Sequence, residues 1–145
     1  MSQYPVSPRD FEFPSLQQAA RDVAEHAHAP YSRFRVGAAL LLDAPEAGFV
    51  ATGCNVENAS FRLTTCAEQA AVASAVARFG PAMRIRAVAI ANLNGAACSP
   101  CGACRQTLLE FSSPETRIAF PGANGTTIFI SLAELLPFAF SFSQA

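Results

Sequence analysis

The sequence predicts an α/β fold with three layers, α-β-α, in which helices cover a five-stranded mixed sheet. Two observations carry this prediction. Five apolar or β-rich runs alternate with stretches of helical periodicity, in the order αββαβαββα. In addition, no internal repeat or linker interrupts the 145 residues, a length that can bury one proper core, so we expect a single domain over residues 1–145.

The N-terminal segment is expected to be irregular before it enters the first helix. Residues 1–14 contain three prolines and show no periodicity. Ser15 and Gln18 have the spacing of a capping box, which predicts a helix over about 16–26. Pro30 lies beyond its end, as expected from the restriction on the residue that precedes a proline.

The five expected strands follow from apolar runs and from the turn residues between them. The run at 36–42 is continuously apolar, which indicates a buried strand, and 49–55 returns after a turn as its hairpin partner. Residues 84–92 begin with alternating charged and apolar side chains and then become continuously apolar, which indicates a third strand buried on at least one face. Two short strands, 116–120 and 127–130, are separated by a Gly-Ala-Asn-Gly turn.

The remaining helices are placed by the signals at their ends. Thr65 is expected to cap the second helix, which ends at Gly80 and the proline after it. Pro100 lies where proline is favoured, in the first turn of a third helix that runs to about Phe111. Ser131 then caps a last short helix, which a Leu-Pro pair ends.

Composition disfavours several classes of function. The net charge is −1 and the ten basic residues are arginines scattered singly, so the chain lacks the basic stripe of a nucleic-acid binder. We also expect no signal peptide and no membrane span, which needs roughly 18 apolar residues in a row. Five cysteines, three of them within 98–104, suit metal binding in a reducing compartment, so we expect a cytoplasmic protein.

The balance of apolar and charged residues predicts self-association. Apolar residues make up 51% of the chain and charged residues 14%, against a usual charged share of about 25%. A domain of this size would have to expose part of that apolar excess. We therefore expect some apolar surface to face other subunits.

Three cysteines and one glutamate carry the chemistry. Cys66 is followed by Glu68, and a Cys-x-x-Cys pair, Cys101 and Cys104, comes later in the chain. Thiolates suit Zn²⁺, and three protein ligands leave the open position of a catalytic zinc site. The expected helix N-termini would stabilise the negative charge of the thiolates. This pattern, with a nearby carboxylate as general acid and base, is typical of zinc-dependent base deaminases.

The same residues have structural explanations as well. Thr65-x-x-Glu68 matches a capping box, in which the glutamate only bonds the start of its own helix. A purely structural zinc would use Cys98 as a fourth ligand, although three ligands within seven residues would strain one tetrahedron. We favour the catalytic interpretation, in which three cysteines bind one zinc ion and Glu68 moves protons.

Longer stretches resemble the small, homotetrameric class of cytidine deaminase. They cover most of the chain from residue 15 onward, in the order and spacing of the family. The matching stretches are Ala-Pro-Tyr-Ser-x-Phe-x-Val-Gly-Ala-Ala at 29–39, Gly-Cys-Asn-Val-Glu-Asn-Ala-Ser at 53–60, Cys-Ala-Glu at 66–68, Pro-Cys-Gly-Ala-Cys-Arg-Gln at 100–106, and Leu-Leu-Pro at 135–137 with Phe140.

This resemblance implies an activity and roles for single residues. The activity is zinc-dependent hydrolytic deamination of cytidine and deoxycytidine to uridine and deoxyuridine, with release of ammonia, in pyrimidine salvage. Glu68 would move protons during attack of water at C4 of the base. Asn55 and Glu57 would hold the ribose 3′-hydroxyl, the Ala67 backbone would contact the base, and Phe34 would pack beside it. From the residues alone, the first two are equally consistent with a turn and the phenylalanine with a core.

The resemblance also implies a tetramer whose sites are shared between subunits. Phe61 and Phe140 stand where the family places aromatic residues that reach a neighbouring subunit's pocket. The alternative is that the Phe-rich tail, 138–142, folds onto its own core. Three positions depart from the family: Gln69 replaces an arginine that bonds the thiolates, Phe61 replaces a tyrosine, and Arg62 replaces a small residue or proline.

Two other functions are consistent with the residues. One is deamination of another aminopyrimidine nucleoside, although the Asn-Val-Glu-Asn-Ala-Ser loop favours plain cytidine. The other is a non-catalytic, zinc-stabilised oligomeric module, which requires Glu68 to be only a cap. A deaminase should lose its turnover in Glu68→Gln, whereas a non-catalytic module should be unaffected by this change.

Overall fold

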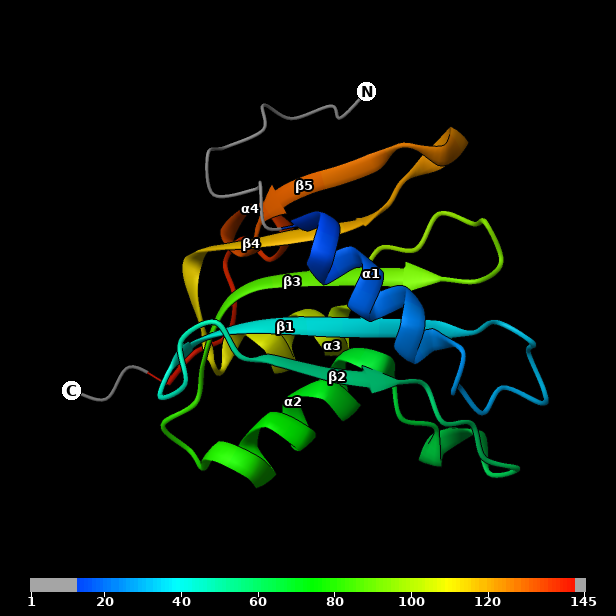
Figure 1. Cartoon of the computed structure of the whole chain (residues 1–145), viewed down its shortest axis with the longest axis horizontal. Coiled ribbons are helices and arrows are strands. Elements are labelled where there is room, and N and C mark those ends of the chain that lie inside the picture. The colour runs from blue at the N-terminus through cyan, green and yellow to red at the C-terminus, as the bar shows by residue number, and fades with distance from the viewer. Residues whose placement is uncertain (1–12, 143–145) are drawn as a thin grey trace.

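The computed structural model describes residues 13–142, in which a five-stranded sheet lies between helices (Figure 1). The elements follow the predicted order. Their bounds are α1 Phe13–Ala24, β1 Val36–Ala44, β2 Val50–Cys54, α2 Ala67–Phe79, β3 Arg84–Asn92, α3 Gly102–Leu109, β4 Ser112–Pro121, β5 Thr127–Ser131 and α4 Leu132–Leu135, with short 3₁₀ turns at Phe61–Leu63 and Ala123–Gly125.

The sheet is mixed, as predicted. Its strand order is β2-β1-β3-β4-β5, with β3 and β4 parallel and the other neighbours antiparallel. The expected hairpin of β1 and β2 is present, with Gly37 opposite Cys54. The parallel pair requires a crossover, and α3 lies within it, which brings the N-terminus of α3 close to that of α2.

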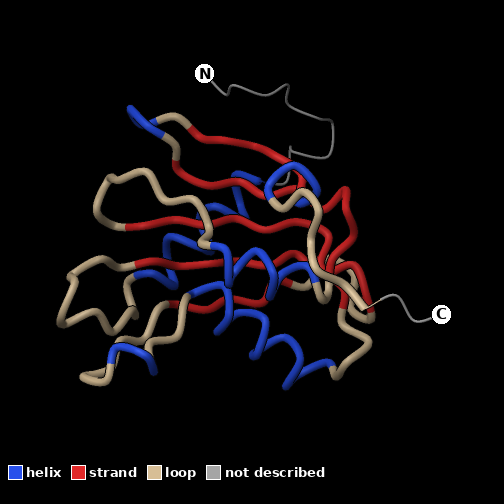
Figure 2. The backbone as a smooth tube through the Cα atoms, turned by 180° about the vertical axis from the view of Figure 1, so that it is seen from behind, coloured by secondary structure: helices blue, strands red, loops and turns tan. Residues whose placement is uncertain are grey.

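Helices cover both faces of the sheet. Figure 1 shows α1 in front of the sheet and α2 and α3 behind it, and Figure 2 shows the second face. Strand β1 is buried on both sides, because Leu40 and Leu42 pack with α2 while Ala39 and Leu41 pack with α1. This double burial explains why the 36–42 run is continuously apolar.

Two glycines let the helices approach the sheet closely. A Cβ built on Gly53 of β2 would lie 2.3 Å from the backbone nitrogen of Ala71 in α2. A Cβ on Gly37 of β1 would lie 1.9 Å from the backbone oxygen of Ala20 in α1. The distance of each helix from the sheet therefore depends on a missing side chain.

The start of α1 differs from the sequence prediction. The helix begins at Phe13 and not at Leu16, so Ser15 lies inside it and is no cap. Gln18 donates instead to the Oδ1 of Asp22, at 2.7 Å. The predicted irregular lead-in over 1–14 is wrong at its last two residues, and its first twelve lie outside the described part of the chain.

The C-terminal elements lie close to their predicted places. Strand β4 begins at Ser112 and not at Thr116, because Ser112 pairs with Ile85 across an irregular stretch of register. Ser131 caps α4 as predicted: its Oγ accepts the Glu134 N–H, and the Glu134 carboxylate accepts the Ser131 N–H. No helix in residues 13–142 has the length and apolar character needed to span a membrane.

Candidate active site

Three cysteines meet where the N-termini of α2 and α3 come together. Cys66 is the N-cap residue of α2, Cys101 is that of α3, and Cys104 lies in the first turn of α3. Their Sγ atoms all lie within 4.8 Å of one another. Two sulfurs bound at about 2.3 Å to one tetrahedral ion are about 3.8 Å apart, so this cluster fits Zn²⁺.

The cluster favours a thiolate at Cys66. The Cys104 thiol donates toward Cys66, which lowers the pKa of Cys66 to about 7. The same hydrogen bond, with burial, raises the pKa of Cys104. The unpaired N–H groups and dipoles of two helix N-termini point at the site, and they stabilise the charge that a metal-bound thiolate carries.

Glu68 is not part of a helix cap. Because α2 begins at Ala67, the cap residue is Cys66 and not Thr65, and no side chain makes a capping hydrogen bond there. Thr65 instead exchanges backbone hydrogen bonds with Val56, each of 2.9 Å. Glu68 is 5% exposed, and its burial raises the pKa of its carboxyl group. The capping-box explanation of Glu68 is therefore wrong.

Cys98 does not join the metal cluster. The group of thiols that could share an ion contains only the other three cysteines of this region, among the residues described. Burial raises the pKa of the Cys98 thiol to about 11, so it stays protonated. The structural site with four thiolates, which the sequence left open, is thus excluded by the arrangement of the sulfurs.

A cavity of about 330 Å³ opens over the cluster. This volume lies within the range of sites for small molecules. Its wall contains the three zinc-site cysteines together with Cys98 and Ser99. None of the described residues in this wall is an arginine, lysine or histidine. Five of the residues singled out in the sequence also line it: Phe34, Asn55, Glu57, Ala67 and Glu68.

Hydrogen bonds hold the two polar residues of the cavity that follow β2. The Asn55 amide accepts the Val36 N–H and donates to the Phe34 carbonyl, each at 2.8 Å. The Glu57 carboxylate accepts the N–H groups of Tyr31 and Ser32, at 2.9 and 3.1 Å, and the Ser32 hydroxyl. Hydrogen bonding from the Ser32 side chain is the main cause that lowers the pKa of Glu57.

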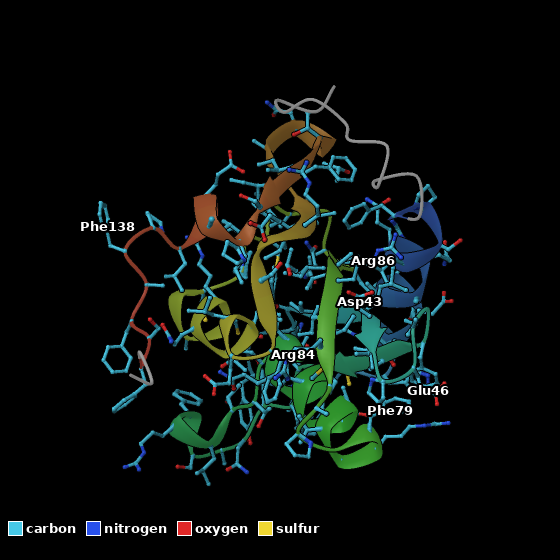
Figure 3. All side chains as sticks on the ribbon, turned by 90° about the vertical axis from the view of Figure 1, so that its left-hand side faces the viewer. Asp43, Glu46, Phe79, Arg84, Arg86 and Phe138 are labelled. Carbon is cyan, nitrogen blue, oxygen red and sulfur yellow. The ribbon has the colours of Figure 1, made fainter. Side chains whose placement is uncertain are left out.

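Phe61 and Phe140 lie outside the cavity of their own chain. Their side chains are 76% and 69% exposed. Phe61 packs edge-on against Tyr31, with ring centroids 5.9 Å apart. The tail does not fold onto its own core: Phe138 and Phe142 are also exposed, and Figure 3 shows Phe138 projecting away from the ribbon.

No role was predicted for Ser32 or Arg105 from the sequence, although both lie in the motifs given above. The Arg105 guanidinium donates to the carbonyls of Pro100 and Leu135, at 2.8 and 2.7 Å, and so ties the loop that carries the cysteine pair to α4. Arg105 is half-buried, and a guanidinium group in such a place needs several acceptors, which its place in the sequence alone does not reveal. Of the positions at which the sequence departs from the family pattern, Gln69 is half-buried in α2 and Arg62 is exposed.

A further cavity lies away from the thiols. It has a volume of about 400 Å³ and lies where β3 begins, with Asp43, Arg84 and Arg86 in its wall (Figure 3). Its wall carries both acidic and basic side chains, and none of the described residues that line it is a cysteine. The thiolate cavity is therefore the candidate active site.

Comparisons with known proteins agree with this site. The profile of the cytidine and deoxycytidylate deaminase zinc-binding region matches residues 14–120. The chain belongs to this family. The family match and the cluster of three sulfurs together confirm the zinc site predicted at Cys66, Cys101 and Cys104.

Individual members of the family match nearly the whole chain. A cytidine deaminase of Mycobacterium tuberculosis is 43% identical over 131 residues, which are 90% of this chain and 91% of that protein. One of Halalkalibacterium halodurans is 39% identical over 127 residues, or 87% and 92% of the two chains.

Solved structures of the family have the same fold. The crystal structure of the Mycobacterium tuberculosis cytidine deaminase matches with a TM-score of 0.77 at 41% identity, covering 92% of this chain and all of that one. That of the Burkholderia pseudomallei enzyme matches with a TM-score of 0.76 at 40% identity, covering 88% and 98%. The predicted α/β fold with its mixed sheet is confirmed.

Proposed function

We propose that this chain is a zinc-dependent hydrolase that deaminates cytidine and deoxycytidine to uridine and deoxyuridine and releases ammonia. One observation carries the proposal: a buried glutamate, Glu68, lies beside a cluster of three thiols inside a cavity of nucleoside size. A zinc site that served only to stabilise the fold would need neither the cavity nor a buried carboxyl group in it.

The proposed catalytic role belongs to Glu68. Zinc held by Cys66, Cys101 and Cys104 would supply a Lewis acid that lowers the pKa of water toward about 7. Burial raises the pKa of Glu68 toward neutral pH, and a carboxyl group with such a pKa can both accept a proton and return it. Glu68 would take one proton from the attacking water and deliver it to N3 of the base as the C4–O bond forms. It would then carry the second proton, from the new C4 hydroxyl, to the amino group, which leaves as ammonia when the C4–N bond breaks and the C4 carbonyl forms.

The wall of the cavity favours a nucleoside over a nucleotide. The charged side chains that this chain contributes, Glu57 and Glu68, are both acidic, and none of its described lining residues offers a cation to a phosphate group. We assign the ribose 3′-hydroxyl to Asn55 and Glu57, and the base to Phe34 and the Ala67 backbone. Deoxycytidine retains the 3′-hydroxyl, so both nucleosides fit this assignment.

We further propose that the chain forms a homotetramer in which each site is completed by neighbouring subunits. Phe61 and Phe140 are large, apolar and exposed, and neither is among the described residues that line the thiolate cavity of their own chain. Contact with another subunit would bury them and gain the corresponding hydrophobic energy. Three thiols poised to bind metal also fit a reducing compartment such as the cytoplasm.

The test is loss of the cytidine absorbance band, followed with purified protein and with zinc quantified in each sample. The wild type is expected to convert cytidine and deoxycytidine, whereas Glu68→Gln should lose at least about a thousandfold in kcat while keeping about one zinc per chain. Glu46→Gln makes the same chemical change at an exposed turn and should behave as the wild type.

Other outcomes lead to other functions. If the wild type holds zinc but leaves cytidine unchanged and deaminates a different aminopyrimidine nucleoside, the substrate assignment is wrong and the reaction class stands. If no aminopyrimidine is converted, or if Glu68→Gln is as active as the wild type, the proposed mechanism is refuted. A zinc-stabilised module would then be the better interpretation.

A further inference from the structure

The ribose side of the cavity contains a serine whose position is unusually well defined. Ser32 lies in the turn between α1 and β1 and lines the cavity next to Glu57. Its backbone N–H donates to the Glu57 Oε1, and its hydroxyl donates to the Oε2. One residue therefore contacts both oxygens of the carboxylate that we assign to the ribose.

Most of the hydrogen-bond acceptor positions of the Glu57 carboxylate are already occupied by this turn. An ionised carboxylate has about four positions for hydrogen-bond donors, two on each oxygen. The Oε1 of Glu57 uses two of them for the N–H groups of Tyr31 and Ser32. The Oε2 uses one for the Ser32 hydroxyl. One acceptor position of Oε2 is left for a donor from the cavity, such as a sugar hydroxyl.

The direction of the serine hydroxyl is also determined. Its Oγ accepts the Phe34 N–H at 3.0 Å, so its single proton is directed to Glu57. This geometry needs a tight turn, and Arg33 supplies it with a left-handed backbone, φ 60°. The left-handed residue is stabilised by two bonds: its N–H donates to the Ala29 carbonyl at 2.9 Å, and its carbonyl accepts from Asn94 at 3.0 Å.

We propose that Ser32 is a positioning residue for the ribose subsite, whose hydroxyl holds Glu57 so that one acceptor position of Oε2 faces the substrate 3′-hydroxyl. The inference rests on the proposed function, because it takes the ligand of Glu57 to be the sugar of a nucleoside. Without the serine hydroxyl, the carboxylate keeps its Oε1 bonds but can turn about its last torsion, which has only broad preferences. The hydroxyl thus supplies orientation, and Phe34 and Asn55 share the same hydrogen-bonded network.

The test compares cytidine with 3′-deoxycytidine, which lacks the hydroxyl in question. The wild type should prefer cytidine in kcat/KM by about tenfold or more, as expected for one hydrogen bond to a charged acceptor. Ser32→Ala should raise KM for cytidine about tenfold and change kcat less than about threefold. The same variant should leave kcat/KM for 3′-deoxycytidine within about twofold of the wild type, so the preference for the hydroxyl nearly disappears.

Three further variants separate positioning from general damage. Ser32→Thr keeps the hydroxyl and should restore most of the preference. In a Glu57→Gln background, Ser32→Ala should have little further effect on the preference, since it acts through that carboxylate. Ser74→Ala, the same change at an exposed serine of α2, should resemble the wild type.

The results distinguish the inference from the function on which it rests. If the wild type prefers cytidine and Ser32→Ala keeps the full preference, the role of Ser32 is refuted while the proposed function stands. A uniform loss on both substrates would mean that Ser32 supports the fold of the loop only, which also overturns the inference. If the wild type shows no preference for the 3′-hydroxyl, the ribose assignment of Glu57 falls, and the role of Ser32 falls with it.

Discussion

A single methyl group on β2 should displace the helix that carries the active site. In Gly53→Ala, the new Cβ would lie 2.3 Å from the Ala71 nitrogen and 2.7 Å from the Ala67 oxygen, both of them backbone atoms of α2. A comfortable contact is about 3.5 Å, so α2 must move away from the sheet by about 1 Å. Backbone atoms cannot rotate out of the way as a flexible side chain can.

The size of the effect follows from that displacement. Overpacking of a core costs about 1–3 kcal/mol, and alanine regains about 0.5–1 kcal/mol of the backbone entropy that glycine loses. We expect the free energy of unfolding to fall by about 1 kcal/mol, which urea denaturation measures. Cys66 is the N-cap of α2 and Glu68 lies in its first turn, and a 1 Å error in a catalytic group can cost about a hundredfold in rate. The kcat of the folded, zinc-loaded variant should therefore fall by one to two orders of magnitude.

A glycine on the other face of the sheet provides the control. In Gly37→Ala, the new Cβ meets the Ala20 backbone oxygen at 1.9 Å, so the chain loses stability at least as strongly. The helix displaced there is α1, which carries none of the zinc ligands. Its kcat per folded, zinc-loaded chain should fall much less than that of Gly53→Ala. Equal losses of kcat in the two variants, or an unchanged kcat in Gly53→Ala, would refute the link between this close packing and the site.

Two further predictions concern the assembly and the last helix. Sedimentation of the wild type should give four times the mass of one chain, and a monomer would contradict this. If sites are shared, Phe140→Ala should also lose activity, and mixing it with Glu68→Gln should restore activity in mixed tetramers; no complementation would contradict shared sites. For α4, the hydrogen bond from the Ser131 hydroxyl lowers the pKa of Glu134 below its usual 4.5. The ionised carboxylate therefore stabilises the fold fully above pH 4.5, and this stabilisation is lost as the pH falls through the lowered pKa. The difference in free energy of unfolding between wild type and Glu134→Gln should thus be present at pH 7 and shrink below pH 4. If urea denaturation gives the same difference at both pH values, this role of the ionised Glu134 is refuted.

Most of the sheet and the metal ligands could be predicted from local patterns. A strand buried on both faces must be apolar at every position, so 36–42 was recognisable without any knowledge of its neighbours. The spacing of three cysteines is likewise a local signal of metal chemistry. The start of β4 could not be predicted from local patterns, because residues 112–115 contain a proline and a glutamate. They join the strand only through pairing with β3. The exposure of the aromatic tail also depends on tertiary packing, which periodicity does not report.

The position of Glu68 shows how tertiary contacts decide between a structural and a chemical role. By intrinsic preference Thr65 is a better N-cap than cysteine, and a helix that began there would place Glu68 at N3, where it would close a capping box. In the folded chain, Thr65 has both backbone groups committed to Val56, so the helix starts one residue later. Glu68 then occupies N2, one position too early to reach back to the cap. Its carboxyl group is turned instead into the cavity, where it bonds to the Cys104 thiol and to the backbone N–H of Glu68 itself, and burial still raises its pKa. Burying a carboxyl group in this way is costly for the fold, and use of that group in proton transfer is the explanation that best accounts for the cost.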